Sequence, residues 1–170
     1  IEHYDNEGRI IRVDFEDFSV LSVYVPSVSN LERLDFKLQF AEDFLEYINN
    51  LQKQIPNLVI CGDFNICHEE IDIHNPKGLK NTSGFLPVER EWITRVIKEC
   101  GLIDSFRFLH PEKQEFSWWS YRQNSRAKNL GWRLDYHFIT KSLETKLERA
   151  LILKEAIHSD HCPGYIELKD

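Results

Sequence analysis

The sequence contains no methionine, and it begins at Ile1. It has no apolar run of the length that crosses a bilayer. Residues 1–20 alternate charged and apolar groups, which excludes the continuous apolar stretch of a signal peptide. These absences predict a chain with no membrane partner. The missing start methionine predicts a chain that is truncated, or processed, at its N terminus.

Cysteine is scarce, and its spacing argues against a zinc ribbon because no two cysteines form a C-x-x-C pair. One cysteine, Cys162, follows His161, but Pro163 comes next and no activating spacing is present, so a structural role is favoured over a catalytic one. Unpaired, scattered cysteines are typical of a reducing, intracellular compartment. The four are Cys61, Cys67, Cys100 and Cys162.

Size and charge suit one soluble domain over residues 1–170, with 42% hydrophobic and 29% charged residues and no repeat or linker. The net charge of −7 argues against indiscriminate binding to nucleic acid. The segment 121–133 nevertheless carries four basic residues and no acidic one, and Lys77 and Lys80 form a second small basic group. The strip predicts phosphate contacts, and a merely solvated basic loop is the alternative.

The hydrophobic pattern predicts a mixed α/β (α+β) layered domain. A hairpin is expected from strands 9–15 and 18–25, followed by an amphipathic helix capped by Asn30 and running to residue 54. Residues 68–86 are polar and contain Pro and Gly, so they are expected to form a long loop. A second helix is expected from Pro87 to Cys100, ended by Gly101. Further strands are expected at 57–61, 116–121, 132–140, 147–153 and 164–168.

Polar side chains stand at the predicted strand ends. Asp63 and Asn65 follow a buried strand, and alternate positions of an extended segment point to one side, so both can serve one site. The alternative is an Asx turn, which the run G-D-x-N also satisfies. Asp135 lies on the polar face of a strand, where an ion pair with Arg133 or with another neighbour is the simpler interpretation.

Two further groups are ambiguous by themselves. Asp160 and His161 offer a metal ligand and a general acid or base, or else a capped turn before Pro163. Tyr24 is expected to pack in its strand. The tryptophans at 118, 119 and 132 are core candidates by default, although beside a basic strip they can line a pocket for a displaced sugar or base.

Taken together and in order, these runs resemble the exonuclease III and abasic-site endonuclease family of DNA-repair nucleases, and in particular the branch that includes the animal enzymes. The resemblance spans nearly the whole chain. Its most specific runs are Gly131 to Tyr136 and Ser159 to Pro163. The others are Gly62 to Asn65, Glu69 to Asp72, Asn75 to Gly78, Gly84-Phe85, Glu89-Arg90, Ser105 to Arg107, Trp119 to Tyr121 and Asn124 to Leu130.

The resemblance implies roles for individual residues. Asp63 would activate the attacking water or assist the leaving oxygen. Asn65 and Tyr24 would hold the scissile phosphate. His161 would contact that phosphate and act as acid or base, with its tautomer fixed by Asp135. Trp118, Trp132 and Leu134 would wall the pocket for a flipped abasic sugar, and Arg122, Arg126, Lys128 and Asn129 would lie along the DNA.

The same resemblance implies a four-layer αββα sandwich and a Mg²⁺ cofactor, or Mn²⁺, held by Asp63, Asn65, Asp160 and His161. It implies cleavage of double-stranded DNA on the 5′ side of abasic sites, with 3′-5′ exonuclease or 3′-phosphatase activity in addition. The compartment would be cytoplasmic in a bacterium and nuclear in a eukaryote. The alternatives are a non-catalytic DNA-binding fragment and a phosphoinositide or small-phosphoester hydrolase.

The chain departs from the family pattern in two places. The main metal-binding Glu of the family, and its Asn or Asp partner, belong to an N-terminal segment that this sequence does not contain. In the loop 79–83 Asn81 is out of register with the DNA-contacting asparagines of the animal enzymes. We therefore expect the strand at 164–168 to have an unpaired edge, covered by the missing N-terminal segment or by a second copy of the chain.

Overall fold

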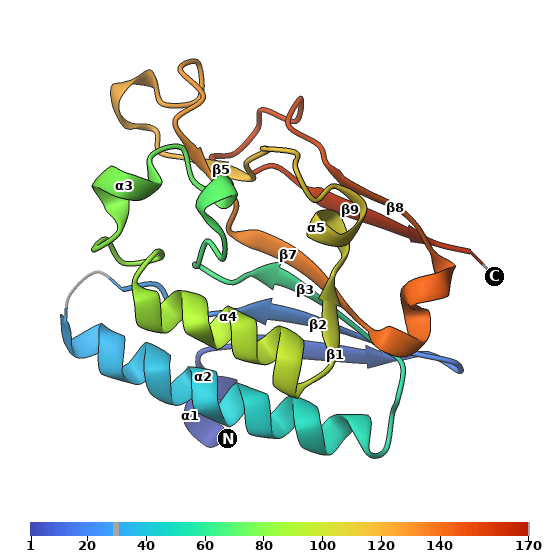
Figure 1. Ribbon diagram of the computed structural model, residues 1–170. Helices are drawn as coiled ribbons and strands as arrows, with labels where there is room; N and C mark the ends of the chain where they lie inside the picture. The colour runs from blue at the N-terminus through green and yellow to red at the C-terminus, as the bar shows by residue number, and fades with distance from the viewer. Residues whose placement is uncertain (29–30, 170) are drawn as a thin grey trace.

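The computed structural model describes residues 1–28 and 31–169, so the expected cap at Asn30 lies outside the described residues. Its centre is a five-stranded sheet in the order β1-β2-β3-β7-β4 (Figure 1). β2 and β3 are parallel, and the other neighbours are antiparallel. The strands are β1 (Ile10–Asp14), β2 (Ser19–Tyr24), β3 (Leu58–Asp63), β7 (Asp135–Thr140) and β4 (Leu102–Asp104).

Two long helices, α2 (Leu31–Gln52) and α4 (Pro87–Glu99), run side by side along one face of this sheet (Figure 1). Both were expected. As predicted, Gly101 follows the end of α4, and its φ of 59° suits a residue without a side chain. Their apolar sides pack on alternate residues of the strands, and the Trp92 indole also donates to the Ala41 carbonyl at 2.9 Å. The main core includes Phe40, Phe44, Ile48, Trp92, Ile93, Leu21, Ile60 and Phe138.

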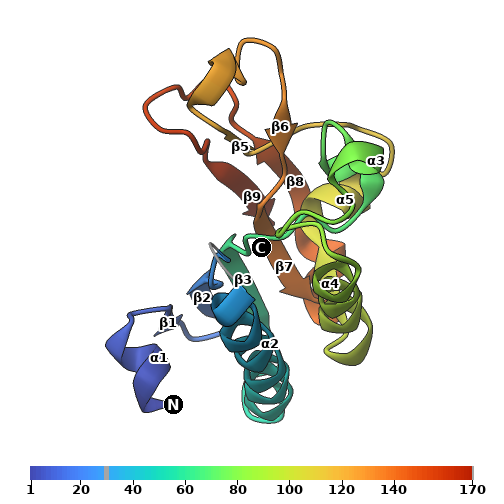
Figure 2. The same cartoon turned by 90° about the vertical axis from the view of Figure 1, so that its left-hand side faces the viewer.

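The opposite face of the sheet carries a smaller sheet made of β8 (Leu147–Ile152) and β9 (Gly164–Leu168). Val59 and Ile139 face this side, because neighbouring strand residues alternate between the two faces, and they cluster with Leu143 and Leu147. Helices, large sheet and small sheet therefore follow one another as layers, and the predicted mixed α/β fold is confirmed (Figure 2). Among the described residues β9 pairs only with β8, as expected for an edge.

The expected strand 132–140 is broken in two. β6 (Gly131–Trp132) pairs with β5 (Trp118–Trp119) in a separate ribbon, and β7 starts only at Asp135. The break falls at Arg133, whose side chain is fully buried and whose backbone N–H donates to the Asp72 carbonyl at 2.8 Å. The prediction of one continuous strand over 132–140, with Arg133 on its polar face, was therefore wrong.

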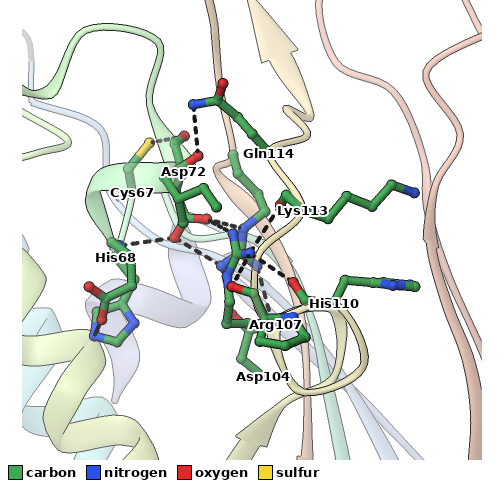
Figure 3. A network of polar contacts seen from close by, with 12 residues as sticks. Cys67, His68, Asp72, Asp104, Arg107, His110, Lys113 and Gln114 are labelled. Atoms are coloured by element: carbon green, nitrogen blue, oxygen red, sulfur yellow. Dashed lines mark hydrogen bonds and ion pairs between the residues drawn. The ribbon is translucent and has the colours of Figure 1, made fainter.

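A buried ionic network holds this break in place. The Arg133 guanidinium makes two hydrogen bonds to the Asp72 carboxylate and two to Asp104, over distances of 2.7 to 3.1 Å. Arg107 approaches Asp72 from a further direction, as Figure 3 shows. The network joins the 68–86 region, the end of β4 and the start of β7. An ion pair of Asp135 with Arg133, one of the two simpler interpretations, is thereby excluded.

Several short elements were missed in the sequence. The expected loop 68–86 contains a 3-10 turn, η1 (Glu70–Asp72), and a short helix, α3 (Pro76–Leu79). The others are α1 (Glu2–Asn6), β4, α5 (Ser105–Leu109), η2 (Arg122–Asn124) and η3 (Lys141–Lys146). In the described part of the chain, no helix combines the length and apolarity that crossing a membrane requires.

Candidate active site

Three neighbouring strands bring their polar ends to one edge of the central sheet. In the register of the sheet Tyr24 at the end of β2 lies beside Asp63 at the end of β3. Asp63 in turn lies beside Asp135 at the start of the antiparallel β7. Side chains more than a hundred positions apart in the sequence thus become neighbours.

A tight turn follows Asp63. Both carboxylate oxygens accept hydrogen bonds from Asn65, one from its backbone N–H at 2.8 Å and one from its side-chain amide at 3.0 Å. The same amide donates to the Val25 carbonyl at 2.9 Å. Asn65 has a φ of 51°, so the two side chains meet through an Asx turn and not through the extended alternation we expected. The Asx turn is therefore no alternative to a shared site, because the turn itself brings the Asp63 and Asn65 side chains together.

Gly62 allows β2 to approach this turn. Its φ is 137°, and a Cβ atom there would lie 2.0 Å from the Val23 carbonyl oxygen. A residue with a side chain would therefore push β2 away from β3 beside Asp63. The glycine of the G-D-x-N run is explained by this close approach.

His161 pairs with Asp135 across the site. Its Nδ1 lies 2.9 Å from the Asp135 carboxylate, an acceptor that fixes the proton on Nδ1 and leaves Nε2 free. Burial disfavours the imidazolium, but the bond to Asp135 and the nearby carboxylates of Asp63 and Asp160 outweigh it and raise the pKa of His161. The ring is therefore a stronger base than a free imidazole, which suits a group that takes up and returns a proton.

The surroundings of Asp63 also shift its pKa. Burial, followed by the charge of Asp135, raises its pKa to about 6, although the Asn65 N–H, His161 and Lys37 act in the opposite direction. A carboxylate of this kind is ionised at neutral pH, yet it is basic enough to take a proton during a reaction.

The Ser159–His161 turn is held by the β5 ribbon. The Trp118 indole donates to the Asp160 carboxylate at 3.0 Å. Burial opposes ionisation of Asp160, but the bonds from Trp118 and Ser159 outweigh it and lower the pKa. Asp160 is therefore anionic over the neutral range, on the same turn as His161.

A cavity of about 310 Å³ opens beside these groups. Trp118 and Trp132 meet edge to face in its wall, with ring centroids 6.3 Å apart, and Leu134 completes the apolar side. Asn65 and His161 supply polar groups on the other side. The expected pocket residues thus come together, whereas Trp119 belongs to a separate core cluster.

The basic strip is divided by the structure. Arg122 and Lys128 are exposed. Arg126 instead donates to three backbone carbonyls, and Arg133 is buried in the ionic network. Asn129 is exposed, and its side-chain oxygen accepts from the Trp119 indole at 3.2 Å. Of the four basic residues of the strip, two thus bond within the chain, so fewer positive charges face solvent than the sequence indicated.

One buried pair behind the site was missed. The Lys37 ammonium donates to Glu89 at 2.7 Å and to the Asn65 carbonyl at 2.9 Å. The other Glu89 oxygen accepts the backbone N–H groups of Gly84 and Leu86. The pair therefore connects both long helices to the turn at Asn65 and to the cavity wall. A lysine at helical spacing from Leu34 and Ala41, on the apolar face, was the available signal.

Comparison with known proteins identifies the family. The sequence signature described as the endonuclease/exonuclease/phosphatase family matches residues 1–161. The chain belongs to the endonuclease/exonuclease/phosphatase family. Enzymes of this family that act on DNA are metal-dependent nucleases.

Relatives within this family include an exodeoxyribonuclease of Bacillus subtilis, 44% identical over 165 residues, which cover 96% of this chain and 65% of the relative. The DNA repair nuclease APEX1 of Danio rerio is 44% identical over 164 residues, covering 95% and 52%. A solved AP endonuclease from Archaeoglobus fulgidus superposes with a TM-score of 0.84 at 30% identity, covering 97% and 66%. The chain spans about half to two thirds of the length of these relatives.

The donor set fits a hard cation in part. Mg²⁺ favours oxygen ligands and keeps several waters, so one or two carboxylates are sufficient protein ligands. Asp63, Asn65 and Asp160 offer such oxygens. Within residues 1–28 and 31–169, however, no three His, Cys, Asp or Glu side chains are grouped as metal ligands are. The described residues that could hold such an ion are therefore Asp63, Asn65 and Asp160.

Proposed function

We propose that this chain is the catalytic part of a Mg²⁺-dependent DNA-repair phosphodiesterase that cleaves the backbone 5′ to abasic sites. Activity as a 3′-5′ exonuclease or 3′-phosphatase would accompany it. The observation that carries the proposal is the Asp135–His161 pair beside Asp63, opening onto a cavity with aromatic walls. The names of the relatives support it, since they include an exodeoxyribonuclease and a DNA repair nuclease.

The proton chemistry would be divided between two groups. Asp63, with its raised pKa, would take the proton of the attacking water or assist the leaving oxygen. His161 would face the phosphate with Nε2, while Asp135 keeps the ring in one tautomer. Tyr24 would donate to a phosphate oxygen as negative charge develops there. Asn65 would do the same only by exchanging one of its two amide bonds, to the Val25 carbonyl or to Asp63, for a bond to the phosphate. Losing one such donor typically costs on the order of 10² to 10³ in rate.

Mg²⁺, or Mn²⁺, would be held by Asp63, Asn65 and Asp160, with His161 nearby. When bound, such an ion neutralises charge on the phosphate and lowers the pKa of coordinated water. The role of these three side chains would be to bind the ion and to orient it toward the phosphate.

The substrate would be double-stranded DNA. Arg122 and Lys128 are exposed for phosphate contacts, and Asn129 lies on the same loop. Trp118, Trp132 and Leu134 would enclose the deoxyribose that remains when a base is absent, because an apolar wall suits a sugar turned out of the stack.

A gel assay tests the proposal. One duplex carries a single abasic site and its twin is intact, and each is incubated with Mg²⁺ or with chelator. Nicking at the lesion only, and only with metal, supports the proposed function. Retention of DNA without nicking would identify a DNA-binding fragment. Release of phosphate from a phosphoinositide headgroup, with neither duplex cut, would identify a small-phosphoester hydrolase.

A second proposal concerns the open side of the sheets. Ile11 and Val13 of β1 are 66% and 51% exposed, and β9 pairs only with β8 in the described chain. We propose that a preceding polypeptide segment, such as the additional length of the relatives, covers this side. Sedimentation of this chain as a dimer would identify a second copy as the cover instead. The four free cysteines fit a reducing intracellular compartment, cytoplasmic in a bacterium or nuclear in a eukaryote.

A further inference from the structure

Arg126 lies in the basic strip that suggested DNA contacts, yet its side chain turns toward the protein. One terminal nitrogen donates to the Ser159 carbonyl at 2.9 Å. The other donates to the carbonyls of Lys154 and Ala156, at 2.8 and 2.7 Å. The guanidinium also lies over the Trp119 ring, 4.6 Å from its centroid. Arg126 therefore joins the 122–130 loop to the whole 154–159 segment.

This segment leads directly into the residues of the candidate site. Ser159 is followed by Asp160 and His161, and the Ser159 hydroxyl accepts the His161 N–H at 3.2 Å. Further along, the Cys162 N–H donates to Ser117 and the Trp119 N–H to Asp160, both through backbone carbonyls. Backbone hydrogen bonds thus fix residues 160 and 162 to β5 and the residue before it, while Arg126 holds the residues that come before the turn and Ser159 itself.

The segment itself has little regular structure. Residues 153–163 form no helix and only an isolated bridge at His161. Lys154, whose side chain is 57% exposed, pairs with Glu115 at 3.7 Å, a long contact of small energetic value. Three charge-assisted hydrogen bonds from one planar guanidinium are a stronger restraint, because the rigid fork loses little freedom on binding.

The geometry points to Arg126 as a positioning residue that holds the Ser159–His161 turn in its active arrangement, and not as a phosphate contact. The inference rests on the proposed nuclease function, and it replaces one role that the family resemblance implied. Lys128, two residues away and exposed, has no side-chain partner within the described chain and provides a matched contrast. Both residues are cationic and share a loop, so only the direction of the side chain distinguishes them.

Three variants test this inference in the full chain: Arg126→Ala, Arg126→Lys and, as the matched control, Lys128→Ala. The first measurement is hydrogen exchange of the Trp119 and Cys162 amides, made without DNA or metal. We expect faster exchange in both Arg126 variants. A lysine ammonium has three N–H donors, but it is compact and cannot span the carbonyls of residues 154, 156 and 159 while lying flat over the Trp119 ring, as the planar guanidinium does. Exchange in the Lys128 variant should match that of the unaltered chain.

The second measurement is the salt dependence of binding to the abasic duplex, together with kcat. A lost phosphate contact lowers the slope of log K against log salt by about one. We expect that change in Lys128→Ala but not in Arg126→Ala. In Arg126→Ala kcat should instead fall about tenfold to a hundredfold, the usual effect of misplaced catalytic groups.

The opposite pattern would overturn the inference. If Arg126→Ala lowers the salt slope by about one and leaves amide exchange unchanged, Arg126 is a phosphate contact. If Arg126→Lys restores both exchange and kcat, charge alone is sufficient and the planar fork has no positioning role. Failure of the unaltered chain to nick DNA would refute the proposed function, and the exchange measurement would still decide the role of Arg126.

Discussion

The buried network around Arg133 permits one prediction in quantitative detail. Arg133→Met removes the cation but keeps much of the volume of the side chain. The carboxylates of Asp72 and Asp104, which are 0% and 5% exposed, then lose four hydrogen bonds. Breaking a buried ion pair in this way costs about 3–5 kcal/mol. Arg107 remains beside Asp72, so we expect a loss near 3 kcal/mol, a large part of the total for a domain of about 5–15 kcal/mol.

The pH dependence of this loss has a definite sign. Burial opposes ionisation of Asp72, but the charge of Arg133 and its hydrogen bonds outweigh it and lower the pKa below its usual range. A depressed folded-state pKa stabilises the fold above the unfolded pKa, and that contribution is lost as the pH falls through the folded value. Without Arg133, protonation of Asp72 relieves part of this cost. The difference in unfolding free energy between variant and unaltered chain should therefore narrow as the pH falls from neutrality toward the folded-state pKa of Asp72, which lies below 3.8.

Urea unfolding followed by far-UV circular dichroism measures both effects, at pH 7 and at the lowest pH where the chain stays folded. Arg149→Met is the matched control, because Arg149 is exposed and its ion pair with Glu167 lies at the surface. It should change stability by less than about 1 kcal/mol. Two results would refute this reasoning. One is a loss of unfolding free energy below about 1 kcal/mol in Arg133→Met at pH 7. The other is a difference in unfolding free energy between Arg133→Met and the unaltered chain that widens in acid.

Three further predictions concern the site. Asp63→Asn and His161→Asn should each abolish incision while the circular dichroism spectrum is unchanged, and cleavage at the original rate in either variant removes that residue from the mechanism. Asp135→Asn should lower the pKa of His161, because the carboxylate that raises it is gone, and NMR titration of the ring protons checks the direction. Lys37→Met leaves Glu89 buried without its cation and should cost about 3–5 kcal/mol in urea unfolding, whereas Lys37→Met with Glu89→Leu should recover part of that loss.

The parts of the fold that follow from local patterns were predictable. The β1–β2 hairpin, the long helix after Pro26 and the helix opened by Pro87 all have strong periodicity and clear end signals, and each is present. The polar residues at strand ends were also identified, because polar groups in an apolar pattern are conspicuous. Their convergence followed from the family resemblance rather than from spacing.

What the sequence did not reveal depends on contacts between distant segments. Arg133 alternates with apolar neighbours as an exposed strand residue does, and only Asp72 and Asp104, 61 and 29 positions away, make its burial favourable. Arg126 has the same composition signal as Lys128, yet its direction is set by carbonyls about 30 positions further along. Lys37 is partnered across 52 positions. A charge pattern gives the number of charges in a segment but not which of them pair inside the fold.

The central claim is that Asn65, Asp63 and the Asp135–His161 pair surround one phosphate. The most direct measurement is a crystal structure of the chain with an abasic-site duplex. We predict a backbone phosphate within hydrogen-bond distance of His161 Nε2 and next to the Asp63–Asn65 turn, with the deoxyribose between Trp118 and Trp132. A duplex bound with its abasic sugar elsewhere, and no phosphate against His161, would contradict the account.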